Sequence, residues 1–189
     1  MTWTAIVPLK AAAQRKTRLS GTLDSTAQAA LAERMAAHVI GTLAGVPAIG
    51  AIRLLSPSPG TLPGTVWEPD RGAGLNAELD RVCASLRGAR VLILHADLPL
   101  VTGEDIAALI AAAEAAGAAI APDRHGTGTN ALALRDAAPA GFAFGADSFA
   151  RHLRLLPGAA AVRRDGLALD IDTADDIAAA GAALPLGRW

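Results

Sequence analysis

The chain has 189 residues, 52% of them hydrophobic and 19% charged, and its 17 Lys and Arg nearly balance 18 Asp and Glu to give a net charge of -1. This length suits one domain with a sizeable core, so we expect residues 1–189 to form a single domain. The near-neutral charge argues against a nucleic-acid binder that works by neutralising phosphates. The apolar content argues against general disorder.

The single cysteine and the first residues bear on the cellular compartment. Cys83 alone excludes an intrachain disulfide and a cysteine-based metal cluster, and its helical surroundings predict a small buried filler. The start M-T-W-T-A-I-V-P-L-K lacks the basic and then apolar order of a signal peptide. The longest apolar stretch, 106–121, is too short and too weakly hydrophobic to span a bilayer. We therefore expect a cytoplasmic protein that does not enter the membrane.

Short apolar segments alternate with segments of helical periodicity along the chain. Strands are predicted, in order, at 4–9, 49–55, 66–67, 91–94, 118–121, 131–134 and 167–171. Helices are predicted at 25–43, 75–86, 103–116, 147–155 and 174–182, with caps at Asp24 or Ser25, Thr102 and Thr173. This alternation predicts an α/β fold: a Rossmann-like, mixed but mostly parallel sheet with helices on both faces.

In open α/β sheets ligands bind beyond the carboxyl ends of the strands, so the residues that follow each strand are candidates for a site. Four cations follow the first strand within nine residues: Lys10, Arg15, Lys16 and Arg18. Such a cluster suits a polyphosphate, with lysine as a point charge and arginine as a bidentate donor. A solvated basic loop is the alternative, and the glycine-rich Walker sequence is absent.

The segment R-G-A-G-L-N, 71–76, precedes the second predicted helix. Gly72 and Gly74 permit a close backbone approach, the helix start offers free N–H groups, and Asn76 supplies a donor and an acceptor. These features suit a nucleotide. Two glycines without a third are a weak signal, however, and a plain loop-to-helix turn explains them too.

Carboxylates follow two of the predicted strands. Asp97 lies in H-A-D-L-P after strand 91–94, and Asp170 and Asp172 are two residues apart at the end of 167–171, where they would share a face. Such charges repel unless a cation lies between them, and Mg²⁺ is held by one or two carboxylates together with substrate phosphates. The three aspartates therefore predict a Mg²⁺ site, with a turn or cap role for Asp97 as the alternative.

Two later stretches combine glycines with hydroxyl side chains. D-R-H-G-T-G-T-N, 123–130, contains Thr129 and Asn130, and F-G-A-D-S-F-A-R-H, 144–152, contains Ser148. These side chains suit a small anionic substrate, and Ser148 also begins a predicted helix whose N–H groups face outward. Ordinary turns with a helix cap are the alternative.

Several of these stretches occur together in one known family. They are A-I-V-P-L-K, K-T-R-L, G-L-N-A-E-L, H-A-D-L-P-L, A-P-D-R-H-G-T-G-T-N-A-L, F-G-A-D-S-F-A-R-H and L-D-I-D-T-A-D-D. In this order they resemble the guanylyltransferases of deazaflavin coenzyme F-420 biosynthesis, within the nucleotidyltransferase superfamily that includes the molybdopterin guanylyltransferases. The resemblance implies a nucleotide-diphospho-sugar transferase-like fold and transfer of GMP from GTP to the phosphate of a small acid, with release of pyrophosphate. Known acceptors in the family are phosphoenolpyruvate, 2-phospholactate and 3-phosphoglycerate.

The same resemblance implies roles for individual residues, with Mg²⁺ as the cofactor and Lys16 and Asp97 as catalytic residues. The implied ligands of Mg²⁺ are Asp97, Asp170 and Asp172, those of the nucleotide are Lys10, Lys16, Arg18, Gly74 and Asn76, and those of the acceptor are Thr129, Asn130, Gly145 and Ser148. Asn130 stands where we expect some relatives to carry threonine, which leaves the identity of the acceptor open.

Three other functions stay open from the sequence. A molybdopterin or sugar-phosphate nucleotidylyltransferase usually carries the loop L-x-G-G-x-S-x-R-M-G, where this chain has K-A-A-A-Q-R-K-T-R-L. A dinucleotide-binding oxidoreductase needs G-x-G-x-x-G directly after the first strand, which is absent. A non-catalytic regulator would bind GTP without turnover. The expected partners are GTP and a small phosphorylated acid, without nucleic acid or membrane, and the apolar tail 184–189 would pack on the domain or on a second copy in a homodimer.

Overall fold

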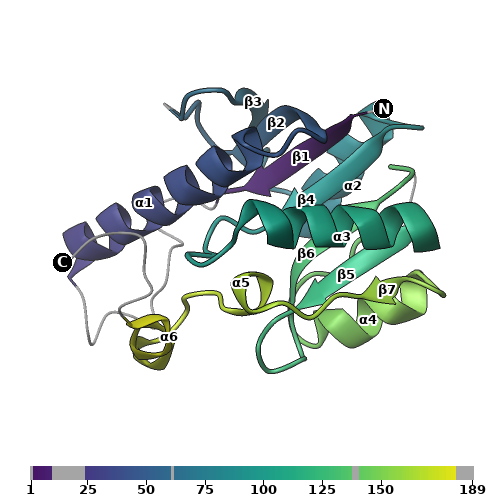
Figure 1. The fold of residues 1–189 in the computed structure, drawn as a ribbon. Helices are drawn as coiled ribbons and strands as arrows, with labels where there is room; N and C mark the ends of the chain where they lie inside the picture. Colours follow the sequence, from purple (N-terminus) through teal and green to yellow (C-terminus); the bar gives the residue numbers. More distant parts are fainter. Residues whose placement is uncertain (1, 10–23, 61, 138–140, 182–189) are drawn as a thin grey trace.

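The computed structural model describes residues 2–9, 24–60, 62–137 and 141–181 (Figure 1). Its strands are β1 (Trp3–Pro8), β2 (Ile49–Ser56), β3 (Val66–Pro69), β4 (Arg90–Leu94), β5 (Ala118–Pro122), β6 (Thr129–Leu134) and β7 (Ala160–Ala161). They form a seven-stranded sheet in the order β3-β2-β1-β4-β6-β5-β7. β6 runs antiparallel to β4 and β5, whereas the other neighbouring pairs are parallel. The predicted mixed, mostly parallel sheet is confirmed.

Three of the six helices in the described residues begin at a side chain that caps them. The six are α1 (Ser25–Ala44), α2 (Leu75–Ser85), α3 (Gly103–Ala116), α4 (Ser148–Leu155), α5 (Asp165–Ala168) and α6 (Ala174–Ala180). Asp24 Oδ1 accepts a hydrogen bond from Ala27 N at 2.8 Å. Thr102 and Thr173 each form a reciprocal capping box with an aspartate three residues later. These bonds satisfy N–H groups that the first helical turn leaves without a partner in the helix.

Helices cover both faces of the sheet. α1 and α3 pack on one face, where Leu109 lies in the same apolar cluster as Leu92 of β4 (Figure 1). α2 and α4 pack on the other, where Val82 lies in one cluster with Ile93, the next residue of β4. Successive strand residues point to opposite faces and both faces are covered, so β4 is apolar at every position from 91 to 94. No helix in the described part of the chain is long and apolar enough to cross a bilayer.

The prediction of a strand at 167–171 is wrong. Residues Asp165–Ala168 form the short helix α5, and the residues directly after it belong to none of the strands of the sheet. Leu169 and Ile171, whose alternation suggested a strand, are buried in a cluster with residues of α1 and α6. β5 pairs with β6 on one side and with β7 on the other, and the sequence does not predict β7. Apolar alternation shows which side of a segment is buried, but not whether that segment pairs with a strand.

The prediction that Cys83 is a buried filler is confirmed, and it leads to a chemical test. The side chain lies within α2 at 1% exposure, and burial, aided by the charge of Asp80, raises the pKa of its thiol to about 12. Because the thiolate is the reactive form, we expect the native protein not to react with a disulfide reagent such as DTNB at pH 8. One thiol per chain should react once guanidinium unfolds the protein. Rapid reaction of the native protein would contradict this account of the core.

Candidate functional site

The candidate site lies at the edge of the sheet where the parallel strands end. β1 to β5 run in one direction, so their carboxyl ends share this edge, and the reversed strand β6 begins there. The loops 70–74, 95–99 and 123–128 leave the sheet at this edge. β1 lies between β2 and β4. From β1 the chain builds one side of the sheet with β2 and β3, and it then crosses back to build the other side from β4. Open α/β sheets bind ligands at the point where the strand order reverses in this way.

The predicted cations lie outside the described residues. Lys10, Lys16 and Arg18 all belong to the segment 10–23. Their contact with a triphosphate, and the catalytic role of Lys16, therefore stay predictions.

Three aspartates from distant parts of the chain gather at this edge. Ile171 N donates to Asp97 O at 3.1 Å, which fastens the segment after α5 to the end of β4. Burial, and then the charges of Asp97 and Asp172, raise the pKa of Asp170 to about 6. The charges of Asp97 and Asp172 thus both act on the Asp170 carboxyl.

Their chemistry fits Mg²⁺, although the side chains do not converge on one point. Within residues 2–9, 24–60, 62–137 and 141–181, no group of three or more His, Cys, Asp or Glu side chains is already arranged as a metal site. Mg²⁺ is commonly held by only one or two carboxylates together with phosphate oxygens and waters, and a cation would relieve the repulsion that raises the pKa of Asp170. The ligand roles of Asp97, Asp170 and Asp172 stay predictions that this donor set supports.

Asp176 fixes the backbone of the segment that carries these carboxylates. Its Oδ2 accepts hydrogen bonds from Asp172 N at 3.0 Å and Thr173 N at 2.7 Å. Its Oδ1 lies 2.6 Å from Arg124 Nη2, in the loop after β5. The cap of α6 therefore also joins the loop 123–128 to the aspartate segment.

Asn130 is buried and directed toward α5. Its Nδ2 donates to Leu167 O at 3.0 Å and Ala168 O at 3.1 Å, and it lies 3.3 Å from Asp170 Oδ1. The amide thus satisfies carbonyls at the end of α5 and orients one aspartate. Its predicted contact with the acceptor is not tested by this arrangement and stays a prediction.

The loop before α2 approaches the same edge with a glycine backbone. Gly72 and Gly74 have φ of 83° and 90°, which only glycine adopts without strain, and Gly74 is the residue that precedes the first turn of α2. Asn76 Nδ2 donates to Phe144 O at 3.1 Å, and Phe144 N donates to Asn76 Oδ1 at 2.8 Å. Asn76 therefore ties α2 to the segment that precedes α4, and its predicted nucleotide contact stays a prediction.

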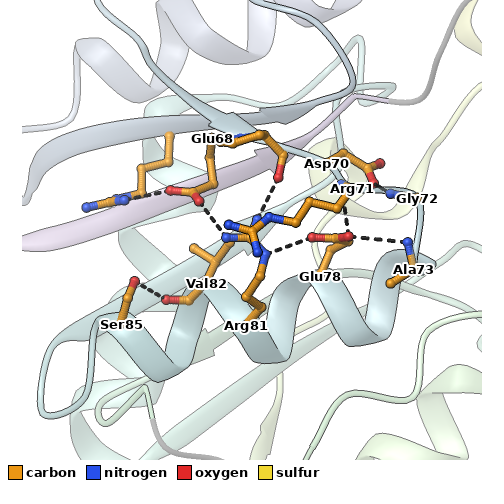
Figure 2. A network of polar contacts seen from close by, with 11 residues as sticks. Glu68, Asp70, Arg71, Gly72, Ala73, Glu78, Arg81, Val82 and Ser85 are labelled. Carbon is orange, nitrogen blue, oxygen red and sulfur yellow. Dashed lines mark hydrogen bonds and ion pairs between the residues drawn. The ribbon is translucent and has the colours of Figure 1, made fainter.

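Glu78 holds this glycine loop in place (Figure 2). The buried carboxylate accepts hydrogen bonds from Arg71 N at 2.9 Å and Ala73 N at 3.2 Å, and from Arg81 Nε at 2.9 Å. Arg81 in turn donates to Glu68 Oε1 at 2.9 Å, at the end of β3. Burial alone would raise the pKa of Glu78, but the bonds from Arg81 and the two amides outweigh it and lower that pKa.

The predicted acceptor residues lie on either side of the junction between β6 and α4. Thr129 and Ser148 are both about 2% exposed, and Thr129 Oγ1 lies 3.0 Å from His152 Nδ1. Gly145 has φ of 117°, in the region that favours glycine. The structure thus brings these residues to the site edge, but it does not test their contact with a ligand.

Sequence reasoning missed Glu78, Asp176 and His152. The first two had local signals: Glu78 has Arg81 three residues later in a helix that follows G-x-G, and Asp176 completes the box T-x-x-D with Thr173. His152 had none, because its partner Thr129 lies 23 residues away.

Comparison with known proteins identifies the family. The model of the family described as guanylyl transferase, CofC like, matches residues 3–179. The chain belongs to the CofC-like guanylyl transferase family. It is 40% identical over 200 residues to the phosphoenolpyruvate guanylyltransferase of Sphaerobacter thermophilus, covering 99% of this chain and 96% of that protein. The corresponding Streptomyces coelicolor protein is 34% identical over 193 residues, covering 95% of this chain and 90% of that one.

Solved structures share the fold of this CofC-like chain. A Desulfovibrio desulfuricans protein described as a nucleotide-diphospho-sugar transferase superposes with a TM-score of 0.77 at 18% identity, covering 97% of this chain and 88% of that one. The 4-diphosphocytidyl-2C-methyl-D-erythritol synthase of Anaerococcus prevotii gives a TM-score of 0.62 at 14% identity, covering 97% and 96%. At these identities the likeness shows the shared fold alone.

The Glu78 network predicts a loss of stability when its charge is removed. Replacing Glu78→Gln leaves Arg81 beside a neutral amide and weakens two backbone hydrogen bonds, so we expect the free energy of unfolding to fall by about 2 kcal/mol. Denaturant titration measures this change. The matched control is Asp80→Asn, two residues along on the exposed side of α2, with an expected change within about 0.5 kcal/mol. Equal stability of the two variants would show that the network contributes little.

The raised pKa of Asp170 predicts how stability depends on pH in the absence of metal. The pKa of the unfolded carboxyl is near its ordinary value of 3.8, but that of the folded one is about 6, so between these values the folded state binds more protons and stability falls as pH rises. Asp170→Asn removes this loss. We expect the variant to be more stable than the native chain at pH 7, by roughly 1–3 kcal/mol, and no more stable at pH 3. A native chain as stable as the variant at pH 7 would contradict the crowding of the three aspartates.

Proposed function

We propose that this chain transfers GMP from GTP to the phosphate of phosphoenolpyruvate and releases pyrophosphate, as a step of deazaflavin coenzyme F-420 biosynthesis in the cytoplasm. The observation that carries the proposal is the meeting of Asp97 with the segment of Asp170 and Asp172, through the bond from Ile171 N to Asp97 O, at the sheet edge where β6 begins with Thr129. The near full-length relative that is 40% identical bears the name of this activity, which favours phosphoenolpyruvate over 2-phospholactate and 3-phosphoglycerate.

The reaction requires the approach of two anions rather than proton transfer. An oxygen of the acceptor phosphate forms a bond to the α-phosphorus of GTP, while the bond from that phosphorus to the β-phosphate oxygen breaks and pyrophosphate leaves. The acceptor is already an anion at neutral pH, so a general base is not required. The barrier is then set by positioning and by the stabilisation of negative charge.

Different groups of residues would bind the cation, the nucleotide and the acceptor. Asp97, Asp170 and Asp172 would hold Mg²⁺, which when bound neutralises phosphate charge. The nucleotide would lie along Gly74 and Asn76, with Lys10, Lys16 and Arg18 toward its triphosphate. The acceptor would be held by the residues already assigned to it, which are Thr129, Asn130, Gly145 and Ser148.

A sugar-phosphate or molybdopterin nucleotidylyltransferase is the nearest alternative. The fold does not exclude it, because a protein described as a nucleotide-diphospho-sugar transferase shares this fold at 18% identity. The curated relatives at 34% and 40% identity, by contrast, are both named as phosphoenolpyruvate guanylyltransferases. A regulator that binds GTP without turnover is the alternative of another class, and turnover itself distinguishes it.

The decisive experiment incubates the protein with GTP, Mg²⁺ and each of the three phosphorylated acids, and follows pyrophosphate release. We expect the highest kcat/KM with phosphoenolpyruvate and a much lower rate when ATP replaces GTP or EDTA removes the metal. Absence of pyrophosphate with all three acids would overturn the proposal. Equal rates with ATP would remove its assignment of guanine.

A variant of the aspartate cluster tests the site within the same assay. Asp97→Asn removes a charge that would bind the cation, so we expect kcat to fall by about 100-fold or more while the circular dichroism spectrum and melting temperature stay close to native. Asp80→Asn is the control, with native turnover expected. Near-native activity of Asp97→Asn would show that Asp97 does not hold the metal.

A further inference from the structure

His152 of α4 is fully buried between two segments that the proposed function assigns to the acceptor. Its Nδ1 lies 3.0 Å from Thr129 Oγ1, at the start of β6. Its Nε2 lies 3.0 Å from Ala143 N, two residues before Gly145. The ring also packs edge-on against Phe144, with ring centroids 4.7 Å apart. A histidine in this position is part of the site's framework, and its chemistry can be worked out from its two neighbours.

The backbone amide fixes which ring nitrogen carries the proton. Ala143 N–H can only donate, so His152 Nε2 must accept and cannot itself carry a hydrogen. The single proton of a neutral ring is then on Nδ1, which donates it to Thr129 Oγ1. Burial, together with the charges of Arg151 and His95, lowers the pKa of His152 to about 4, so the ring is neutral at physiological pH.

The direction of this bond determines what the Thr129 hydroxyl offers. Because its oxygen accepts from His152, its own hydrogen is directed elsewhere, and a hydroxyl hydrogen seeks an acceptor. Thr129 begins β6, at the edge of the sheet where β4 ends, and its side chain points to the side of α4. The hydroxyl is thus prepared as a donor at the edge of the sheet where the candidate site lies.

The other side of the ring fixes the segment that leads to Gly145 and Ser148. Ala143 is held by His152, and the next residue, Phe144, is held on both its N–H and C=O by Asn76. Through one imidazole, the spacing between Thr129 and this segment is therefore fixed.

We propose that His152 is a positioning residue for the acceptor: it turns the Thr129 hydroxyl into a hydrogen-bond donor for an anionic oxygen of the acceptor and sets the distance from Thr129 to the Gly145 segment. The proposal rests on the proposed function. His152 touches neither reactant, so its effect is exerted through Thr129 and the Ala143 backbone.

The proton position is tested without any assay of activity. In protein labelled with ¹⁵N at histidine, the two ring nitrogens of each tautomer differ in chemical shift and in their couplings to the ring hydrogens. We expect His152 to show the neutral form with the proton on Nδ1 from pH 6 to 8. A proton on Nε2, or a doubly protonated ring at pH 7, would overturn the proposal.

Kinetics of four proteins test whether His152 acts through Thr129: the native chain, Thr129→Val, His152→Gln and the double variant. Glutamine reaches about the place of Nε2 and keeps an acceptor for Ala143 N–H, but it does not replace the Nδ1 donor. We expect each single variant to raise the KM for phosphoenolpyruvate about 10- to 100-fold, the cost of a lost hydrogen bond to a charged group, with kcat and the KM for GTP within about twofold. The double variant should be no worse than the worse single variant. If the two single variants' increases in KM multiply in the double variant, the proposal is wrong.

Two further variants separate positioning from general support of the fold. The side-chain amide of asparagine reaches about the place of Nδ1, so His152→Asn should recover most of the affinity for phosphoenolpyruvate that His152→Gln loses. The control is His38→Gln, a half-buried histidine of α1 whose Nε2 lies 3.0 Å from Val101 O, with native KM expected. If the native chain turns over phosphoenolpyruvate but the increases in KM of the single variants multiply in the double variant, this proposal alone is wrong. If the native chain turns over none of the acids, the proposed function is wrong as well.

Discussion

The reversed strand β6 is the constraint on which the rest of the site depends. β4 ends at Leu94, paired with Ala131, and the pairing continues through the bond from His95 N to Asn130 O at 3.0 Å. The start of β6 and the end of β4 therefore meet at one edge. Had β6 been parallel, Thr129 would lie at the opposite edge, about 17 Å away at the usual rise per strand residue.

Two kinds of carboxylate lie buried or half-buried in the protein. Glu78 of α2 and Asp105, in the first turn of α3, are of the first kind. Burial alone would raise the pKa of each, but hydrogen bonds from Arg81 and from Arg164, the residue before α5, outweigh burial and lower both pKa values. Asp170 is of the second kind, because the charges that act on it most strongly are those of other aspartates, and its pKa is raised. Paired carboxylates strengthen the framework, whereas a carboxylate crowded by like charges costs stability and is typical of a site that binds a cation.

The sequence was sufficient wherever a feature depends on neighbours along the chain. The caps at Asp24, Thr102 and Thr173 and the apolar strand before Asp97 are of this kind, because a cap or a buried strand needs only a few adjacent residues. The predicted strand that carries Asp170 failed, since packing on α1 satisfies the same apolar alternation as a sheet does. The segment that carries Asp170 still lies beside Asp97, because the topology returns it to the end of β4.

The other differences between the sequence prediction and the structure come from side chains whose partners lie far along the chain. The sequence suggests Asn76 and Asn130 as ligand contacts, and in the structure both also use their amides on the protein's own backbone, 68 and 37 residues away. With His152 they fix the segments around the site, so a substrate that contacts either amide meets a group whose position is already set. Such groups need little reorganisation when charge develops in a reaction. The two amides therefore serve the framework of the site and the proposed contacts at the same time.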